Sequence, residues 1–202
     1  MMRAFLITLS LVAAGCVASG AEARSHARPT PLPKVAIVTS EGTITAVLEA
    51  KRAPITTANF LHYVDTHRFD GTYFYRAARS KSVKGNGLIQ GGLDHNIAKS
   101  FLPIKHEPTS KTGIKHTDGT LSMARNEVGS AMADFFITIG PAPDLDARGS
   151  YVGYAAFGHV ISGMGVAKKI LAKPTFPGGY DIITVGQTIR QPVKIITVKR
   201  IN

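Results

Sequence analysis

The sequence predicts one mainly β domain, an antiparallel barrel or sandwich over residues 34–202. Short runs rich in β-branched and aromatic residues recur along the chain, and many of its 20 glycines separate them. Only two stretches have helical periodicity, and they are isolated, whereas a doubly wound sheet would alternate strands with helices. The 202-residue chain is long enough to bury a core without disulfides, and its single cysteine, Cys16, precedes the domain.

The first predicted elements are a β-hairpin and a helix. Residues 35–38 and 44–48 are two β-branched runs on either side of a Ser-Glu-Gly turn. Pro54 then begins a helix, because its missing N–H costs nothing in the first helical turn. The apolar stripe expected on this helix consists of Ala58, Phe60, Leu61 and Val64.

The remaining elements are mostly short strands. The strand candidates lie at residues 72–77, 119–124, 134–139 and 155–161. A second, short helix is predicted over 164–171, with an apolar face formed by Val166, Ile170 and Leu171. Residues 193–201 are rich in β-branched side chains and form the closing strand.

Residues 1–33 are predicted to be an export signal, 1–23, and a linker, 24–33. An apolar run follows Arg3, and it is too short to span a ~30 Å bilayer as a helix of about 20 residues. Two processing sites compete, an Ala-x-Ala site ending at Ala23 and a lipobox-like sequence ending at Cys16. The linker contains three prolines and no apolar periodicity. Either site predicts a periplasmic protein, and lipidation of Cys16 would anchor it to the membrane.

The net charge of +11 raises the question of polyanionic partners. The basic residues are spread along the chain without a run of five or more. We therefore expect no specific nucleic-acid partner, and polyanion binding remains a hypothesis supported only by charge.

The sequence lacks the patterns of the common catalytic and cofactor sites. Gly85-Asn86-Gly87 begins like a dinucleotide fingerprint, but position 90 is not glycine and no helix-forming run follows. Asp144 and Asp146 have no further carboxylate at calcium-loop spacing. The seven histidines lack metal-ligand spacing and are expected at the surface, and no serine has a nucleophile-elbow context. We expect no metal and no cofactor.

Four sequence blocks occur in a specific order and spacing. They are FYRAAR…LIQGG within 74–92, GTLSMAR at 119–125, DFFITIG at 134–140 and LDARGSYVGYAAFGHVISGM at 145–164. Together they resemble the cyclophilin family of peptidyl-prolyl cis–trans isomerases, especially its exported bacterial branch. With APITTANFLHYV and the closing strand, the resemblance covers nearly all of 34–202. It implies a closed eight-stranded antiparallel β-barrel capped by two α-helices, with the site on the outer barrel face.

The reaction that the resemblance implies needs little chemical machinery. The planar X–Pro bond has a rotation barrier of ~18–20 kcal/mol, and no bond is broken when it isomerises. Twisting frees the lone pair of the prolyl nitrogen, so a fixed cation that donates a hydrogen bond to this nitrogen stabilises the twisted state selectively. One charged hydrogen bond, at ~1.5–3 kcal/mol, together with a desolvating pocket, is of the required size.

The resemblance assigns the site by motif position. Arg76 matches the catalytic arginine, and Gln90 matches the glutamine that binds the substrate backbone and steadies the arginine. Phe135 and Phe136 alternate along a strand, and we assign Phe136 to the site. The proline pocket maps onto Leu88, Met123, Phe136 and Leu145. The other substrate-binding positions are Tyr75, Ala124, Arg125, Asn126, Asp134 and Tyr154.

Three departures from the family pattern stand out. The segment between Arg76 and Gln90 is longer than usual, and its insert, residues 79–86, contains Arg79, Lys81 and Lys84. The phenylalanine usual in this segment is also missing, and Gly87 takes its place. The second departure is Asp134 in place of a glutamine, and the third is Asp144 in place of an aromatic residue. Asp134 is expected to pair with Arg76 or with an insert lysine, and it would then position the arginine or neutralise its field.

The leading hypothesis is a monomeric exported prolyl isomerase, of reduced activity, that assists the folding of envelope proteins. Its partners would be proline-containing polypeptides. The main alternative is a non-catalytic peptide-binding or chaperone-like module of the same fold, whose basic insert recognises acidic partners. The third hypothesis is a polyanion-binding surface protein.

Overall fold

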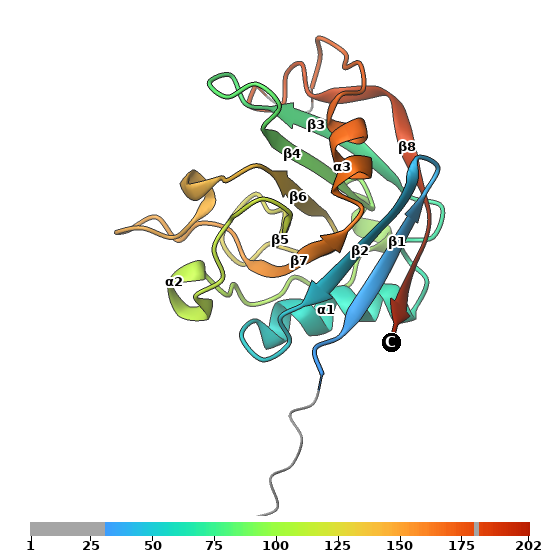
Figure 1. Ribbon diagram of the computed structural model, residues 1–202. Helices are drawn as coiled ribbons and strands as arrows, with labels where there is room; N and C mark the ends of the chain where they lie inside the picture. The colour runs from blue at the N-terminus through green and yellow to red at the C-terminus, as the bar shows by residue number, and fades with distance from the viewer. Residues whose placement is uncertain (1–30, 180–181) are drawn as a thin grey trace, which may run out of the picture. The chain divides into compact units, whose positions relative to one another are not determined.

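A closed antiparallel β-barrel forms the protein in the computed structural model, which describes residues 31–179 and 182–202 (Figure 1). The strands are β1 (Lys34–Thr39), β2 (Gly42–Leu48), β3 (Tyr73–Arg79), β4 (Gly87–Gly92), β5 (Thr120–Met123), β6 (Phe135–Ile139), β7 (Ala156–Ser162) and β8 (Thr188–Ile201). They are joined in the order β1-β2-β7-β5-β6-β4-β3-β8, with every neighbouring pair antiparallel. The expected eight-stranded barrel is confirmed.

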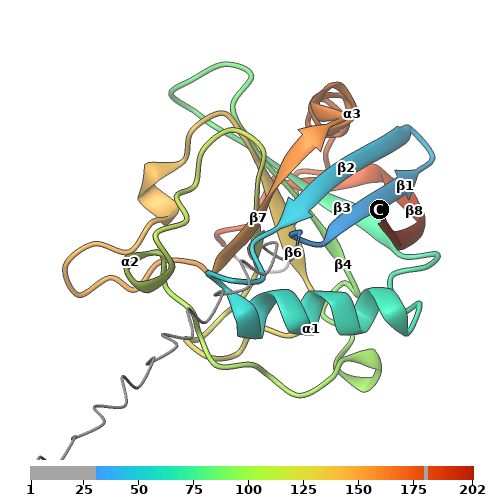
Figure 2. The same cartoon turned by 60° about the horizontal axis from the view of Figure 1, so that its bottom comes forward.

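Helices α1 (Pro54–Asp65) and α3 (Met164–Leu171) lie at opposite ends of the barrel (Figures 1 and 2). Short helical turns add α2 (Thr109–Thr112), η1 (Ile97–Lys99) and η2 (Pro143–Leu145). Both predicted helices are present, but their buried faces differ in detail. Ala58 is exposed, because it lies one turn before exposed His62 on the solvent side of α1. On α3, Ala167 is fully buried and Val166 only partly.

The barrel interior is filled by side chains, with an aromatic cluster toward the α1 end. Phe60 of α1 packs edge-on against Phe135 of β6, with ring centroids 5.2 Å apart. The other fully buried aromatic side chains of this cluster are Tyr63, Phe69, Phe74 and Phe157. Because the interior is packed, a substrate site has to lie on the outer wall.

Strand β4 was missed by the strand patterns because it consists largely of glycine and has little β-branched character. Its glycines allow neighbouring strands to approach closely. A Cβ on Gly91 would lie 2.8 Å from the Tyr73 carbonyl oxygen, and one on Gly92 would lie 2.6 Å from Asp134 Oδ1. The strand therefore forms where larger residues would not fit.

The last strand begins earlier than its pattern predicts, at Thr188 rather than Val193. Phe74 pairs with Val193 but Arg76 pairs with Thr188, so β8 is irregular between these two positions. Pro192 lies exposed within this irregular stretch, where its missing N–H is tolerated. The extension places the start of β8 beside Arg76.

At the N-terminal end of the domain, β1 begins at Lys34, and the Pro33 carbonyl accepts a hydrogen bond of 2.8 Å from the Leu48 N–H. The predicted signal, the lipobox and most of the linker lie outside the described residues, so export stays a prediction. Within 31–179 and 182–202, no helix is long and apolar enough to cross a membrane.

Candidate active site

The central site residues lie in a row across three neighbouring strands. Arg76 of β3 is directly opposite Gln90 of β4, and Gln90 is directly opposite Phe136 of β6. Directly opposed residues point to the same face of a sheet, and here that is the outer face of the barrel. Phe135 points inward into the aromatic core, so the assignment of Phe136 to the outer face agrees with the structure.

A β-bulge in β3 brings two consecutive side chains to this face. The pairing register shifts between Phe74 and Arg76, while Phe74 and Ala77 both belong to the core. The side chains of Tyr75 and Arg76 therefore both lie on the outer side of the barrel. Strict alternation along the strand would have placed one of them inside the barrel.

Two glutamines hold the Arg76 guanidinium from different elements. Arg76 Nη1 donates to Gln90 Oε1 at 2.7 Å, and Arg76 Nε donates to Gln187 Oε1 at 2.8 Å. The Gln187 amide is itself fixed, because its Nε2 donates to the Ile183 carbonyl at 2.7 Å. Sequence reasoning missed Gln187, which belongs to no motif and reaches Arg76 only through the early start of β8.

The hydrogen bonds continue from Gln90 to Asp134. With its oxygen accepting from Arg76, Gln90 donates through Nε2 to the Tyr75 hydroxyl oxygen at 2.7 Å. The Tyr75 hydroxyl in turn hydrogen-bonds the Asp134 carboxylate. Burial raises the pKa of Tyr75 well above its ordinary value, so the hydroxyl stays protonated and can donate. The chain of bonds sets the orientation of the Gln90 amide.

Asp134 does not pair as expected. Its carboxylate accepts the backbone N–H groups of Asp94, at 2.9 Å, and His95, at 3.0 Å. Within the described part of the chain, no ion pair joins it to Arg76 or to an insert lysine, and the His95 Nδ1 lies 3.8 Å from Asp134 Oδ2. Burial raises the pKa of Asp134, and the hydrogen bond from the His95 backbone opposes this rise.

Asp134 stabilises a strained turn. Asp94 and His95 both have positive φ, at 52° and 59°, a conformation that costs energy in residues other than glycine. Their N–H groups donate to the Asp134 carboxylate, and these charge-assisted hydrogen bonds stabilise the turn. The aspartate therefore acts on Arg76 only through Tyr75 and Gln90.

Phe136 is the centre of the apolar part of the site. Its ring is nearly buried and stands edge-on to Tyr154, with centroids 5.5 Å apart. Leu88 of β4 and Leu145 of η2 are half-buried, and the Leu145 carbonyl accepts the N–H of Tyr154 at 2.9 Å. Met123 was assigned to this pocket and instead belongs to the core, because it is paired with inward-facing Phe135.

The segment after β5 forms one margin of the site. Ala124 is half-buried, and its N–H donates to the Asp134 carbonyl at 2.8 Å. The Arg125 guanidinium lies over the Tyr154 ring, 4.8 Å from its centroid, and donates to the Gly153 carbonyl at 2.7 Å. Asn126 is exposed. Arg125 is therefore linked to Phe136 through the Tyr154 ring.

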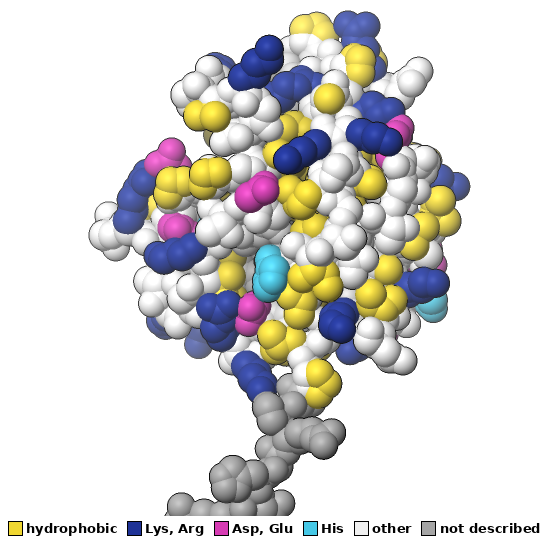
Figure 3. Space-filling model, in the orientation of Figure 1, with side chains coloured by type: hydrophobic (Ala, Val, Ile, Leu, Met, Phe, Trp, Pro, Cys, Tyr) yellow, Lys and Arg dark blue, Asp and Glu magenta, His cyan; other side chains and the backbone are white. Residues whose placement is uncertain are grey.

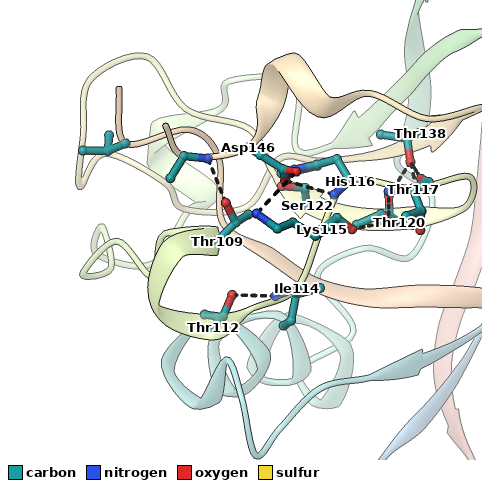
Figure 4. Close-up of polar contacts among 12 residues, drawn as sticks. Thr109, Thr112, Ile114, Lys115, His116, Thr117, Thr120, Ser122, Thr138 and Asp146 are labelled. Atoms are coloured by element: carbon teal, nitrogen blue, oxygen red, sulfur yellow. Dashed lines mark hydrogen bonds and ion pairs between the residues drawn. The ribbon is translucent and has the colours of Figure 1, made fainter. Parts of the chain in front are cut away.

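His116 belongs to a polar network with Asp146 and Ser122, next to Phe136; the polar contacts of the network are drawn in Figure 4. The His116 ring stacks on Phe136 and lies between the Asp146 carboxylate, 2.8 Å from Nδ1, and the Ser122 hydroxyl, 2.9 Å from Nε2. Burial lowers the pKa of His116, which favours the neutral ring. The surface position expected for this histidine is wrong, and the network ties η2 to β5.

The departures at Gly87 and Asp144 leave part of the site margin open. Gly87 has φ +155°, and a Cβ there would lie 2.2 Å from the Ala78 carbonyl oxygen, so a phenylalanine does not fit this backbone. Asp144 points into solvent with a side chain 85% exposed, and it pairs with Arg148 at 2.8 Å. Neither position supplies an apolar wall.

The fold and the site define a class of closed barrels that carry their site on the outer wall. Residues 34–200 match the family model for cyclophilin type peptidyl-prolyl cis-trans isomerases. A peptidyl-prolyl cis-trans isomerase of Acinetobacter baylyi is 37% identical over 169 residues, which cover 82% of this chain and 84% of that relative. Peptidyl-prolyl cis-trans isomerase A of Dickeya dadantii is 35% identical over 164 residues, covering 80% and 84%.

A solved structure supports the same fold. The crystal structure of a Cryptosporidium parvum cyclophilin type isomerase superposes with a TM-score of 0.65 at 22% identity, covering 85% of this chain and 98% of that one. The chain belongs to the cyclophilin-type peptidyl-prolyl cis–trans isomerase family and is an enzyme of that class.

Proposed function

We propose that this isomerase acts on exported proline-containing polypeptides and that Arg76 is its catalytic residue. The observation that carries the proposal is the fixed guanidinium, which two glutamines hold at 2.7 and 2.8 Å in the same row as Phe136. The proline ring of a substrate packs against Phe136, Leu88 and Leu145. Its prolyl nitrogen then faces Arg76.

In this mechanism Arg76 stabilises the twisted amide. As the X–Pro bond rotates, the nitrogen loses conjugation and becomes a hydrogen-bond acceptor for the guanidinium. The interaction is absent in the planar ground states, so it lowers the barrier rather than tightening binding. Reaching ~10 s⁻¹ from the uncatalysed rate takes about 3–4 kcal/mol, at ~1.36 kcal/mol per tenfold in rate.

The surrounding residues keep the arginine in place without competing for the nitrogen. Gln90 and Gln187 accept hydrogen bonds from two different nitrogens of the guanidinium and so restrain its plane. Asp134 lies further along the chain of hydrogen bonds and orients Gln90 through Tyr75. Of the two effects considered for Asp134, positioning is the one that this arrangement supports.

The substrate class follows from the family and from the N-terminal sequence. A related Cryptosporidium parvum cyclophilin type isomerase has been crystallised in the presence of the dipeptide Ala-Pro, which supports proline-containing substrates here. The export signal predicted before Arg24 supports a periplasmic enzyme that assists the folding of exported proteins, with membrane attachment only through a lipid on Cys16. We propose that it acts as a monomer.

The test is a protease-coupled isomerisation assay with proline peptides. Arg76→Ala should lower kcat/KM at least tenfold, and Arg76→Lys should restore only part of it, because an ammonium cannot donate to both glutamine oxygens in one plane as the guanidinium does. Arg52→Ala is the matched control, since Arg52 forms only a partly exposed pair with Glu49 away from the site. An Arg76→Ala variant as active as the control, with an unchanged unfolding midpoint, contradicts the assignment.

A further inference from the structure

The outer face that carries the site continues toward the other end of β4 and β6. Outward positions repeat every second residue, so half-buried Leu88 follows Gln90 along β4, whereas Thr138 of β6 is covered by the 117–120 turn. Beyond them lies a hollow of about 410 Å³, lined among others by Lys84, Asn86, Asp118, Pro141 and Lys168. At ~3.3 Å per residue, the four residues from Gln90 to Asn86 place it about 13 Å from the centre of the site.

The wall of the hollow is an ordered part of the insert. The Ser80 hydroxyl accepts the backbone N–H groups of Ser82, at 3.3 Å, and Val83, at 3.1 Å. The Ser80 N–H donates to the Asn86 carbonyl at 2.8 Å, which closes the loop. The extra residues therefore form a turn that holds Lys84 at the edge of the hollow.

The floor depends on a glycine at position 140. Gly140 has φ +78°, and a Cβ there would lie 2.3 Å from the Asn86 side chain, so Asn86 packs directly on its backbone. The Gly140 N–H donates to Asp118 Oδ1 at 2.7 Å. Asp118 is the one carboxylate among the described residues that line the hollow, and one of its oxygens is thus already engaged.

The charge at the hollow is mainly positive. Lys84 comes from the insert and Lys168 from α3, and both side chains are exposed. Across 31–179 and 182–202, no carboxylate lies within ion-pair distance of either, whereas nearby Lys173 is paired with Glu41. Figure 3 shows further Lys and Arg side chains over the end of the molecule that carries α3 and the β3–β4 loop.

We propose that this hollow is a subsite for an acidic side chain of the substrate, about four residues from the proline. The inference rests on the proposed function, because it takes the peptide to run in extended form from Phe136 along the outer face. A carboxylate in the hollow faces two ammonium groups that have no carboxylate partner in the described chain. A lysine at the same substrate position meets like charges.

The expected preference is modest and depends on salt. Contacts between exposed charges are weak individually, so two of them should raise kcat/KM roughly three- to tenfold for a glutamate peptide over its glutamine counterpart. The preference should shrink at high ionic strength, where exposed charges are screened. A neutral peptide should be turned over at the same rate under both conditions.

The experiment compares peptides that carry Glu, Gln or Lys at each position on either side of one proline. The wild-type protein should prefer Glu over Gln only at positions about four residues from the proline. The double variant Lys84→Glu with Lys168→Glu should reverse the order, so that the Lys peptide becomes the best substrate while the Gln peptide is unaffected. Lys51→Glu with Lys199→Glu is the control, because it changes the net charge equally at exposed positions outside the hollow.

Two results overturn the subsite. One is a glutamate preference that is absent or the same at all positions. The other is a preference that the control variant reverses as well, because that indicates the overall charge rather than the hollow. Direct peptide binding, followed by fluorescence anisotropy, gives the same comparison without turnover. If no peptide is isomerised, the proposed function fails, but the binding order in the two double variants still decides on the subsite.

Discussion

The two halves of the site differ in how firmly their side chains are held. Around Arg76, consecutive hydrogen bonds of 2.7 to 2.8 Å link Tyr75, Gln90 and Gln187. At two other positions of the site margin, Gly87 has no side chain and Asp144 turns toward solvent. Under the proposed mechanism the difference separates two requirements, since catalysis by one charged hydrogen bond needs a fixed arginine, whereas binding of flanking residues tolerates change. The predictions below test this separation, beginning with the firmly held half.

The largest effect is expected from Gln90→Ala. The substitution removes the acceptor of Arg76 Nη1 and leaves the buried Tyr75 hydroxyl without its donor. We expect kcat/KM to fall at least tenfold and the free energy of unfolding to fall by about 1–3 kcal/mol, the usual cost of an unsatisfied buried polar group. Isomerisation kinetics and urea unfolding measure the two quantities. A variant with normal activity would show that the arginine does not depend on this bond.

A smaller loss is expected from Gln187→Ala, about three- to tenfold in kcat with little change in KM. Gln187 contacts the arginine only through Nε, and Gln90 still holds the other side. In an Arg76→Ala background the same substitution should have no further effect, because a positioning residue acts only through its partner. Additive losses in the double variant would instead indicate that Gln187 acts on the substrate or on the fold.

Asp134→Asn tests whether the carboxylate is needed to orient Gln90 through Tyr75. The pH dependence of the free energy of unfolding also tests the ionisation of Asp134. Because burial raises the pKa of Asp134 above its unfolded value, folding disfavours the ionised form. Its stabilising contribution is present below the ordinary aspartate pKa of ~3.9 and is lost as pH rises through the higher folded-state pKa. The wild type should therefore lose stability relative to the asparagine variant across that range.

Comparing the wild type with the Asp134→Asn variant isolates the contribution of the Asp134 carboxyl group. Glu41, Glu49 and Asp65 have lowered pKa values because of their basic partners, so their contributions run the opposite way, but both proteins share them. Unfolding free energies from urea titrations at several pH values give the difference curve. A curve that stays flat through the acid range contradicts a raised pKa for Asp134. Activity should fall about two- to fivefold, since the amide still accepts from Tyr75 but can also donate.

Patterns in the sequence predicted the barrel wall and the helices well, because alternation and helical periodicity report burial directly. They failed where local geometry departs from regular periods. Strand β4 is too rich in glycine to be recognised, and the bulge at Tyr75 turns two consecutive residues to one face. Met123 was misplaced because its motif neighbours lie at the site while its own side chain points inward.

The contacts of the site were less predictable than its residues. Gln187 is 111 residues from Arg76 in sequence, and no motif links them. Asp134 was expected to pair with a cation because a basic side chain is the obvious partner of a carboxylate. Instead, the strained turn at Asp94 and His95 offers it two N–H donors. Such choices depend on which backbone groups the fold leaves unsatisfied, and that is known only once the loops are placed.

The smallest effect is expected from Asp144→Trp, in the loosely built half. Asp144 is largely exposed and pairs only with exposed Arg148, so losing that pair should change the free energy of unfolding by less than about 0.5 kcal/mol. A large aromatic side chain at this position can cover the open edge beside Leu145 and add apolar contact for the residue next to the proline. We expect KM to fall about two- to fivefold for peptides with an apolar flanking residue, while kcat stays the same. Asp144→Ala is the control that removes the charge without adding the wall. If the tryptophan variant changes kcat instead, the two halves of the site are coupled, and the separation between catalysis and flanking-residue binding does not hold.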